Sequence, residues 1–298
     1  MTGLPDREVE LLDALPASAP LLLRSLGAGV TRRVTGRRPA TLPVRQVRVH
    51  DVTQDVARLA AYDRVCGFGV RDRVPATWLH VLAFPLQLHL LSADDSPFAL
   101  AGLVHVTNTM TLHRPVTVSE AVTLAVSYGT PREHRRGVLL DLVAEASVGD
   151  EVVWRGVSSY LVRGETLPGT VPGAGEVDLP VDFPHVPTDN VWRLPAGLGR
   201  AYAAVSGDAN PIHLSPLAAK AFGFPRTIIH GMWTQARVLA ALDNRLPDAH
   251  RIDARFTKPI LLPSTVRFGA AATPTGYDSV VRSRDGERSH LVVRVSRV

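Results

Sequence analysis

Two parts of this chain repeat one another weakly and in the same order. Residues 61–67 (AYDRVCG) match residues 201–207 (AYAAVSG), and residues 112–116 (LHRPV) match residues 256–260 (FTKPI). The apolar positions that follow each proline also correspond, with 116, 118, 122 and 124 matching 260, 262, 266 and 268. Each match alone is at chance level, but matches in the same order predict that one supersecondary plan is used twice.

A change of composition separates the two repeats. Residues 164–187 hold four glycines and five prolines but no lysine or arginine. Glycine and proline without apolar periodicity are typical of a linker. We therefore expect an N-terminal extension over residues 1–39, a first unit over 40–163, a linker over 164–187 and a second unit over 188–298.

Both units show a helix followed by strands. In the second unit, residues 231–242 are almost all apolar or small, which predicts a buried helix with strands at 252–257, 265–272, 279–284 and 290–298. In the first unit we expect a helix over 85–93 with Pro85 at its first position, and strands at 100–112, 121–128, 138–148 and 152–162. One helix against antiparallel strands, made twice, predicts an α+β fold.

Composition excludes several classes of protein. The chain is 45% hydrophobic and 20% charged, which is typical of a globular protein and not of a disordered one. No apolar run approaches the roughly 18 residues that a membrane-spanning helix needs. The single cysteine, Cys66, excludes a disulfide framework and a multi-cysteine metal site. The N-terminus carries acids before any apolar stretch, so we expect no secretory signal and a cytoplasmic protein.

Positive charge is concentrated near the N-terminus. The net charge is +5, and seven arginines but no acid lie between Arg24 and Arg48. Such a segment is either a solvated, partly mobile stretch or a surface for nucleic acid, a coenzyme A phosphate or an acidic carrier protein. Nucleic acid is the weakest of these partners because no aromatic residues are interleaved with the arginines.

The segment 202–223 (YAAVSGDANPIHLSPLAAKAFG) carries the residues that suggest chemistry. Pro211 prevents one continuous helix here and disfavours a helical conformation for Asn210. Residues 206–211 must therefore form a tight turn, which allows the side chains of Asp208 and His213 to converge. A carboxylate and an imidazole at one point can hold a water molecule and move its proton. Alternatively, Asp208 caps a turn and His213 is a structural residue.

The residues after this turn fix its far side. Ser215 is a favourable helix cap, Pro216 a favourable first helical residue, and Gly223 a favourable terminator. Together with residues 222–226 (FGFPR) and 230–232 (HGM), the whole pattern resembles the signature of the MaoC-like hydratase/dehydratase family, the R-specific enoyl-thioester hydratases. The resemblance is specific in this segment, extends through the strands of the second unit and is weak in the first unit.

This resemblance implies a fold and an activity. The arrangement is similar to the double-hotdog members of the family, in which two hotdog folds are fused. It implies interconversion of (3R)-hydroxyacyl and trans-2-enoyl thioesters in fatty acid metabolism, on coenzyme A or acyl carrier protein, with no metal or other cofactor. The two units then form a pseudo-dimer within the chain, and two chains can pair further as a homodimer.

The resemblance also implies roles for individual residues. Asp208 and His213 hold the water and shuttle its proton. Gly231 opens the buried helix, so its N–H is free to stabilise the oxyanion of the thioester. Asn210 holds the turn through a bond between its side chain and the backbone. Three further residues are expected to support the substrate site: Ser206, Tyr202 and Met232.

The first unit lacks these groups in the register of the repeat. The residues that take the places of Asp208, His213 and Gly231 are Phe68, Arg73 and Pro85. Proline has no N–H and cannot donate to an oxyanion. We therefore expect one active site per chain, in the second unit, with space in the first unit for a long or bulky acyl tail.

Other kinds of site have weaker support. Asp208, His213 and His230 lack the spacing typical of zinc sites, and His230 is expected to be structural. No nucleophile elbow of a serine hydrolase occurs in the sequence. Two alternatives to the hydratase stay open: a hotdog thioesterase that releases a free thiol from its substrate, and a non-catalytic protein that binds acyl thioesters.

Overall fold

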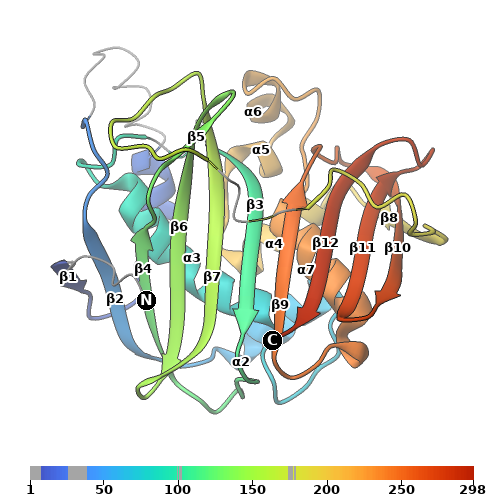
Figure 1. Ribbon diagram of the computed structural model, residues 1–298, viewed down its shortest axis with the longest axis horizontal. Coiled ribbons are helices and arrows are strands. Elements are labelled where there is room, and N and C mark those ends of the chain that lie inside the picture. Colours follow the sequence, from blue (N-terminus) through green and yellow to red (C-terminus); the bar gives the residue numbers. More distant parts are fainter. Residues whose placement is uncertain (1–7, 26–38, 99, 101–102, 174–176, 178) are drawn as a thin grey trace.

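The computed structural model describes residues 8–25, 39–98, 100, 103–173, 177 and 179–298. Its strands form one continuous sheet (Figure 1). Among the described residues, no second sheet packs against either face of it. The helices lie together on one side of that sheet. None of the described helices is both long enough and apolar enough to cross a membrane.

The first part of the chain supplies one half of the sheet. Its elements are β1 (Glu8–Leu11), β2 (Arg45–Val52), α2 (Val56–Cys66), α3 (Ala76–Ser92), β3 (Leu103–Leu112), β4 (Val122–Tyr128), β5 (Arg132–His134), β6 (Gly137–Val148) and β7 (Glu151–Arg163). The second part supplies β8 (Asn190–Leu194), α4 (Leu198–Ser206), α5 (Pro211–Leu214), α6 (Pro216–Ala221), α7 (Gly231–Leu242), η2 (Asp243–Arg245), β9 (His250–Phe256), β10 (Ser264–Thr273), β11 (Gly276–Ser283) and β12 (Ser289–Arg297).

The two halves follow one plan. The first half has the strand order β2-β4-β6-β7-β3, and the second half continues it in mirror order as β9-β12-β11-β10-β8. The halves join where β3 and β9 pair antiparallel, with Met110 opposite Ile252. Each half places one long helix, α3 or α7, against its own strands. The predicted α+β double hotdog is confirmed, and the pairing of β3 with β9 makes the chain its own pseudo-dimer.

The helix of the first unit begins earlier than the sequence analysis predicted. α3 starts at Ala76 after Pro75, and Pro85 lies in its interior instead of at its first position. The helix is buried on nearly all sides, so it shows no amphipathic periodicity that would mark its start. Packing on every face offsets the roughly 3 kcal/mol that an internal proline costs a helix. The second helix, α7, spans the predicted residues 231–242.

Hydrogen bonds give the true register between the units. The Val74 N–H donates to the Val116 carbonyl (2.8 Å), just as the Ile229 N–H donates to the Ile260 carbonyl (3.0 Å). Counting onward from these bonds, Ala76 is the counterpart of Gly231, so the alignment of Pro85 with Gly231 was wrong.

The alignment of Arg73 with His213 was also wrong. Arg73 forms an isolated bridge with Thr117 as Ile228 does with Leu261, so Arg73 corresponds to Ile228. Residues 208–228 of the second unit are replaced by the much shorter segment 68–73 in the first. The first unit therefore has no counterpart of α5 and α6, and His213 has no partner position there at all.

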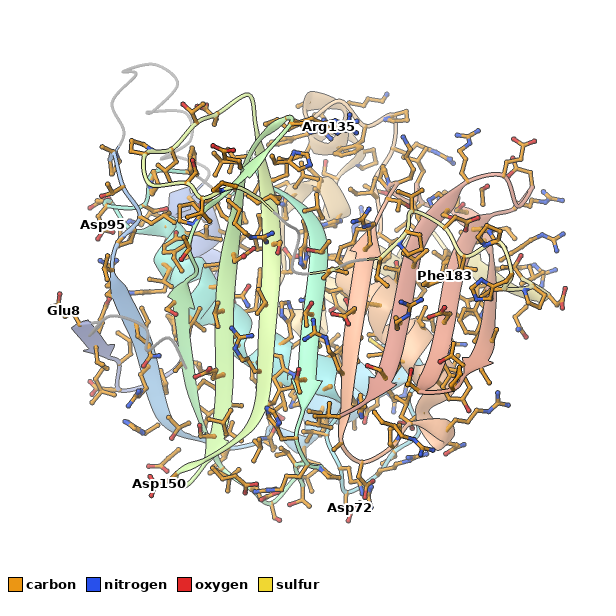
Figure 2. The ribbon with its side chains drawn as sticks, viewed as in Figure 1. Glu8, Asp72, Asp95, Arg135, Asp150 and Phe183 are labelled. Atoms are coloured by element: carbon orange, nitrogen blue, oxygen red, sulfur yellow. The ribbon has the colours of Figure 1, made fainter. Side chains whose placement is uncertain are left out.

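The segment between the units packs against the sheet. Phe183 and Val186 form a small apolar cluster with Val280 and Val292 on the face of the sheet away from the helices, and Figure 2 shows Phe183 lying over that face. The Arg282 guanidinium fixes this segment by donating to the Phe183 carbonyl (2.7 Å) and by an ion pair with Asp182 (3.0 Å). The predicted linker is thus ordered over its described second half.

The described parts of the N-terminal extension also belong to the fold. β1 pairs in parallel with β2 at the edge of the sheet, and residues 18–25 form a helix that buries Leu22. Of the arginine-rich stretch, residues 26–38 lie outside the described part. Arg24 pairs with Asp94 (3.0 Å) and Arg45 with Glu10 (3.0 Å), so these two charges are partly neutralised within the chain.

Candidate active site

The predicted turn forms directly after α4. The helix ends at Gly207, whose φ of +80° is a left-handed conformation that glycine adopts without strain. The Ser206 hydroxyl oxygen accepts from the Asp208 N–H (3.2 Å), and the Asp208 carboxylate accepts from the Asn210 N–H (3.2 Å). The Asn210 side-chain oxygen accepts from the Ile212 N–H (3.4 Å). Ser206 and Asn210 therefore hold the turn on both sides of Asp208.

A pair of stacked imidazoles lies next to this turn. The rings of His213 and His230 stack with centroids 3.6 Å apart. The His213 Nδ1 donates to the Ile228 carbonyl (2.8 Å), and the His230 Nε2 donates to the Asp208 carbonyl (2.9 Å). Each ring is thus fixed by a backbone acceptor, and in the neutral state the His213 Nε2 keeps a free lone pair.

Asp208 and His213 lie close together, as the turn suggested, and His230, which was expected to be only structural, lies with them. One ligand atom from each lies within 4.8 Å of the others, which is close enough for one water molecule to bridge them. The two histidines are buried, whereas 28% of the Asp208 side chain is exposed, so solvent reaches the carboxylate.

Burial shifts the pKa of each group toward its neutral form. Desolvation raises the pKa of Asp208, opposed by His213 and by the Asn210 N–H. Desolvation lowers the pKa of His213, opposed by Asp208 and by the Ile228 carbonyl. Desolvation, reinforced by His213, lowers the pKa of His230 well below its ordinary value. Both imidazoles are therefore neutral at pH 7 and can accept a proton.

Gly231 brings a helix N-terminus to the same place. It is the first residue of α7, where backbone N–H groups have no partner within the helix. A Cβ at this position would lie 2.9 Å from the ring of Phe256, so only glycine fits without displacing that ring. The N-terminus of α7 therefore presents N–H groups and a favourable dipole beside the Asp208 turn.

Tyr202 and Met232 support the site through packing. Tyr202 is 2% exposed and packs its ring against His230, with centroids 4.9 Å apart. Met232, the second residue of α7, is 8% exposed and belongs to the main apolar core. Within the described part of the chain, neither side chain forms a hydrogen bond to Asp208 or His213, whereas Ser206 and Asn210 bond directly within the Asp208 turn.

The first unit places two aromatic residues near this site that the sequence did not predict. His105 on β3 stacks on Tyr160 of β7, with centroids 4.6 Å apart, and also contacts the ring of Phe256 at 4.8 Å. Burial raises the pKa of Tyr160, and the charge on Asp208 adds to this effect, so the phenol lies within electrostatic reach of the carboxylate. No motif marks these two residues, because their place depends on strand pairing.

The same three groups are a poor fit for a metal ion. A zinc ion needs ligand lone pairs that converge on one point about 2.0–2.1 Å away. The His213 and His230 rings are stacked with planes only 25° apart, so their in-plane lone pairs run side by side. In addition, one nitrogen of each ring already donates to a backbone carbonyl. This geometry suits proton transfer better than metal binding.

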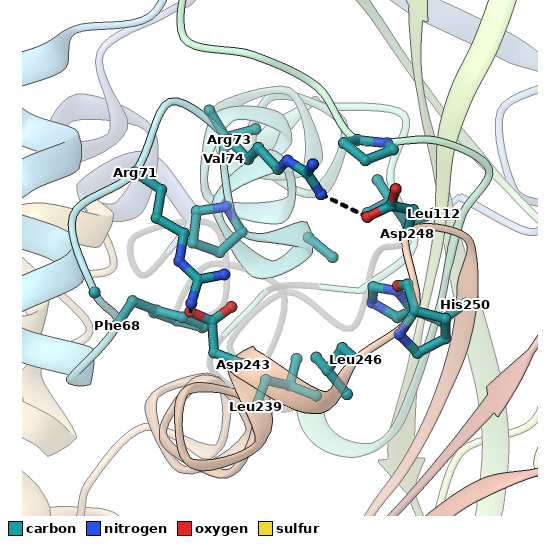
Figure 3. Close-up of a pocket in the computed structure, with 15 residues that line it drawn as sticks. Phe68, Arg71, Arg73, Val74, Leu112, Leu239, Asp243, Leu246, Asp248 and His250 are labelled. Atoms are coloured by element: carbon teal, nitrogen blue, oxygen red, sulfur yellow. Dashed lines mark hydrogen bonds and ion pairs between the residues drawn. The ribbon is translucent and has the colours of Figure 1, made fainter.

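In the first unit, ion pairs lie at the position that matches the N-terminus of α7. Around the N-terminus of α3 a small pocket is lined by Phe68, Arg71, Arg73, Asp243 and Asp248, among others (Figure 3). Arg71 pairs with Asp243 (3.1 Å) and Arg73 pairs with Asp248, so both arginines bridge to the other unit. Phe68 follows Gly67 as Asp208 follows Gly207. The pocket also contains Asp248 and His250, but Asp248 pairs with Arg73 and the Nδ1 of His250 donates to the Pro247 carbonyl.

These features together define a double-hotdog protein with an acid–imidazole cluster of Asp208, His213 and His230 in its second unit. Comparison with known proteins places it further. A family model described as "MaoC like domain" matches residues 180–293. The chain is 41% identical over 260 residues to 3-hydroxyacyl-thioester dehydratase X of Mycobacterium tuberculosis, covering 85% of this chain and 90% of that protein. This chain therefore belongs to the MaoC-like dehydratase family.

Solved structures agree with this placement. The crystal structure of HtdX from M. tuberculosis has a TM-score of 0.75 and 39% sequence identity, and it covers 85% of this chain and 100% of that one. A MaoC-like dehydratase from Phytophthora capsici has a TM-score of 0.72 at 17% identity, covering 87% of this chain and 97% of that one. At such low identity the second likeness concerns the fold alone.

Proposed function

We propose that this protein is a (3R)-hydroxyacyl-thioester dehydratase, which in reverse hydrates trans-2-enoyl thioesters. The observation that carries the proposal is the meeting of Asp208, His213 and the N-terminus of α7 in one partly exposed site. Similarity to a 3-hydroxyacyl-thioester dehydratase along most of the chain supports it. The substrate class is an acyl chain in thioester linkage to coenzyme A or to acyl carrier protein.

In the proposed mechanism, Asp208 and the free Nε2 of His213 both accept a hydrogen bond from one water. A water that donates both of its hydrogens keeps an oxygen lone pair free, which is the nucleophile that attacks C3 of the enoyl thioester. The pair removes a proton from this water as the C–O bond to C3 forms and delivers that proton to C2, so that one molecule of water is added across the double bond. Dehydration follows the same path in reverse.

The negative charge that develops on the thioester oxygen is stabilised by the Gly231 N–H. Helix N-termini supply such donors together with a favourable dipole. The ring of Phe256 packs where a Gly231 side chain would be, so glycine at position 231 lets the start of α7 and this ring keep their positions. Ser206 and Asn210 are proposed to keep Asp208 in position through the turn.

The test is hydration of crotonyl-CoA and of dodecenoyl-CoA by the purified protein. Hydration removes the conjugated double bond and its absorbance, and chiral analysis identifies the 3-hydroxyacyl product. We expect the (3R) product, and comparison of the two chain lengths measures how much tail the site accepts. Turnover of the short substrate alone would contradict the idea that the first unit makes room for a long tail.

Two further outcomes would replace this proposal. Release of free thiol, detected with a thiol reagent, would indicate a thioesterase. Saturable binding of acyl thioesters without turnover would indicate a non-catalytic binding protein.

We also propose that the unit boundaries fall at residues 40–163 and 188–298, that the protein works in the cytoplasm, and that acyl carrier protein and a second copy of the chain are candidate partners.

A further inference from the structure

Among the described residues near the site, the Nδ1 of His230 and the Nε2 of His105 are buried without a hydrogen-bond partner, and only the second of these comes from the other unit. The Nε2 of His105 is buried and has no hydrogen-bond partner among the described residues. Its ring lies between Tyr160 and Phe256, and Phe256 is the ring that contacts the Gly231 position. His105 is therefore one aromatic ring away from the proposed oxyanion donor, although it comes from the other unit.

A β-bulge turns His105 toward this site. In the pairing of β3 with β7, His105 lies opposite Tyr160 but Thr107 lies opposite Ser159, so Val106 is an extra residue. Without the bulge, His105 would share the face of Thr109, whose hydroxyl bonds Asp253 on the opposite side of the sheet from the helices. Bulges of this kind re-aim a side chain and are frequent beside active sites.

The hydrogen bond that the His105 ring makes with Thr107 determines which kind of partner its Nε2 can take. Burial lowers the pKa of His105 to about 3, opposed by a hydrogen bond with the Thr107 backbone, so the ring is neutral at pH 7. Because this bond raises the pKa, it favours the protonated ring, so the ring is the donor in it, and with Nε2 unpartnered the donating atom is Nδ1. In a neutral imidazole whose Nδ1 carries the proton, Nε2 is an acceptor. A group that satisfies it must be a hydrogen-bond donor.

We propose that His105 is a specificity-determining residue supplied by the non-catalytic unit, whose Nε2 accepts a hydrogen bond from a donor on the bound acyl thioester. This inference rests on the proposed function for the identity of the ligand. Two parts of such a ligand carry suitable donors: a hydroxyl group on the acyl chain, or an amide N–H of the thiol arm that carries it.

The experiment compares binding of three unreactive ligands by calorimetry: hexanoyl-CoA, 5-hydroxyhexanoyl-CoA and unacylated coenzyme A. The variant is His105→Phe, which keeps a ring between Tyr160 and Phe256 but removes Nε2. The matched control is His250→Phe, because His250 is also buried but lies in the pocket of the first unit. Thermal unfolding of both variants shows whether they fold.

Loss of one neutral hydrogen bond is expected to weaken binding about 2- to 12-fold. Weaker binding of 5-hydroxyhexanoyl-CoA alone identifies an acyl hydroxyl as the donor. Equal weakening of all three ligands identifies the thiol arm. Unchanged affinities for all three, in a folded His105→Phe protein, overturn the proposal.

A measurement on the unmodified protein removes dependence on the variant. In ¹⁵N NMR of labelled histidine, an unprotonated ring nitrogen that accepts a new hydrogen bond changes its chemical shift. We expect the Nε2 signal of His105 to move when the ligand is added, and an unmoved signal at saturation refutes the proposal. Hydration of crotonyl-CoA is assayed separately. Absence of hydration with His105-dependent binding refutes only the proposed function, and failure of the unmodified protein to bind any of the three ligands refutes both.

Discussion

Replacement of Asp208 by asparagine tests the proposed chemistry most directly. The amide has nearly the shape of the carboxylate, and its oxygen can still accept the hydrogen bond from the Asn210 N–H. It cannot take up a proton from water. Loss of a positioned general base costs roughly 10²–10⁴-fold in rate, which corresponds to about 2.7–5.4 kcal/mol of transition-state stabilisation.

The same substitution should not weaken the fold. Desolvation raises the pKa of Asp208. A carboxyl with a raised folded-state pKa favours folding only while protonated, and that contribution is lost as the pH rises through the folded-state pKa. At pH 7 the amide therefore removes a desolvated charge, and we expect an equal or higher melting temperature.

The assay follows crotonyl-CoA hydration by the loss of enoyl absorbance, with melting temperatures measured in parallel. Asp243→Asn is the matched control. Asp243 is a carboxyl whose pKa is also raised by desolvation, but it lies in the closed pocket of the first unit, where it pairs with Arg71. We expect the control to retain most of its activity. An Asp208→Asn protein with more than about a tenth of the original kcat/KM would refute the general-base role, because that loss is far below the range for such a base.

Three further outcomes are expected. Gly231→Ala should lower kcat/KM by about 10²-fold, since its methyl group displaces the Phe256 ring and a 1 Å shift at the reacting groups has that effect; full activity would exclude close approach of substrate there. The kcat/KM of hydration should fall as the pH is lowered, because Asp208 must be ionised and His213 neutral, and the raised pKa of Asp208 moves its titration toward neutral pH; a loss of activity as the pH rises from 7 to 8 would contradict this. Arg282→Ala should lower the unfolding free energy by about 1–3 kcal/mol in urea titrations without changing turnover, since it removes the guanidinium that donates to the Phe183 and Val186 carbonyls and leaves the Val186 carbonyl without that donor.

The first unit lacks a segment that the second unit has in front of its long helix. The second unit carries α5 and α6 between its catalytic turn and α7, and the first unit crosses the same distance with residues 68–73. Because the first unit has no such segment, it has no position equivalent to His213, and no substitution within it could supply one. In the corresponding segment of the first unit, Arg71 and Arg73 instead pair with acids of the second unit. The first unit contributes to the site through its strands, where His105 and Tyr160 lie.

Much of this protein follows from local sequence. The Asp208 turn could be anticipated because Gly207 and Pro211 restrict the backbone on either side of it, and such restrictions depend only on neighbouring residues. The helix over residues 231–242 was equally local, because Gly231 begins a run of small and apolar residues that Asn244 and Pro247 bring to an end. The segments that form β3, β4, β6, β7 and β9 to β12 were also predicted from the sequence, whereas β1, β2, β5 and β8 were not.

Tertiary structure decided the features that depend on distant segments. α3 extends through Pro85 because burial on every side outweighs the lost backbone bond. The segment before β8 is held by Arg282, a contact between residues a hundred positions apart. His105 packs against Tyr160 and Phe256 because the register between β3 and β7 slips by one residue at Val106. Local preference fixes where a turn can form, but only long-range strand pairing fixes which side chains of one unit face the turn of the other.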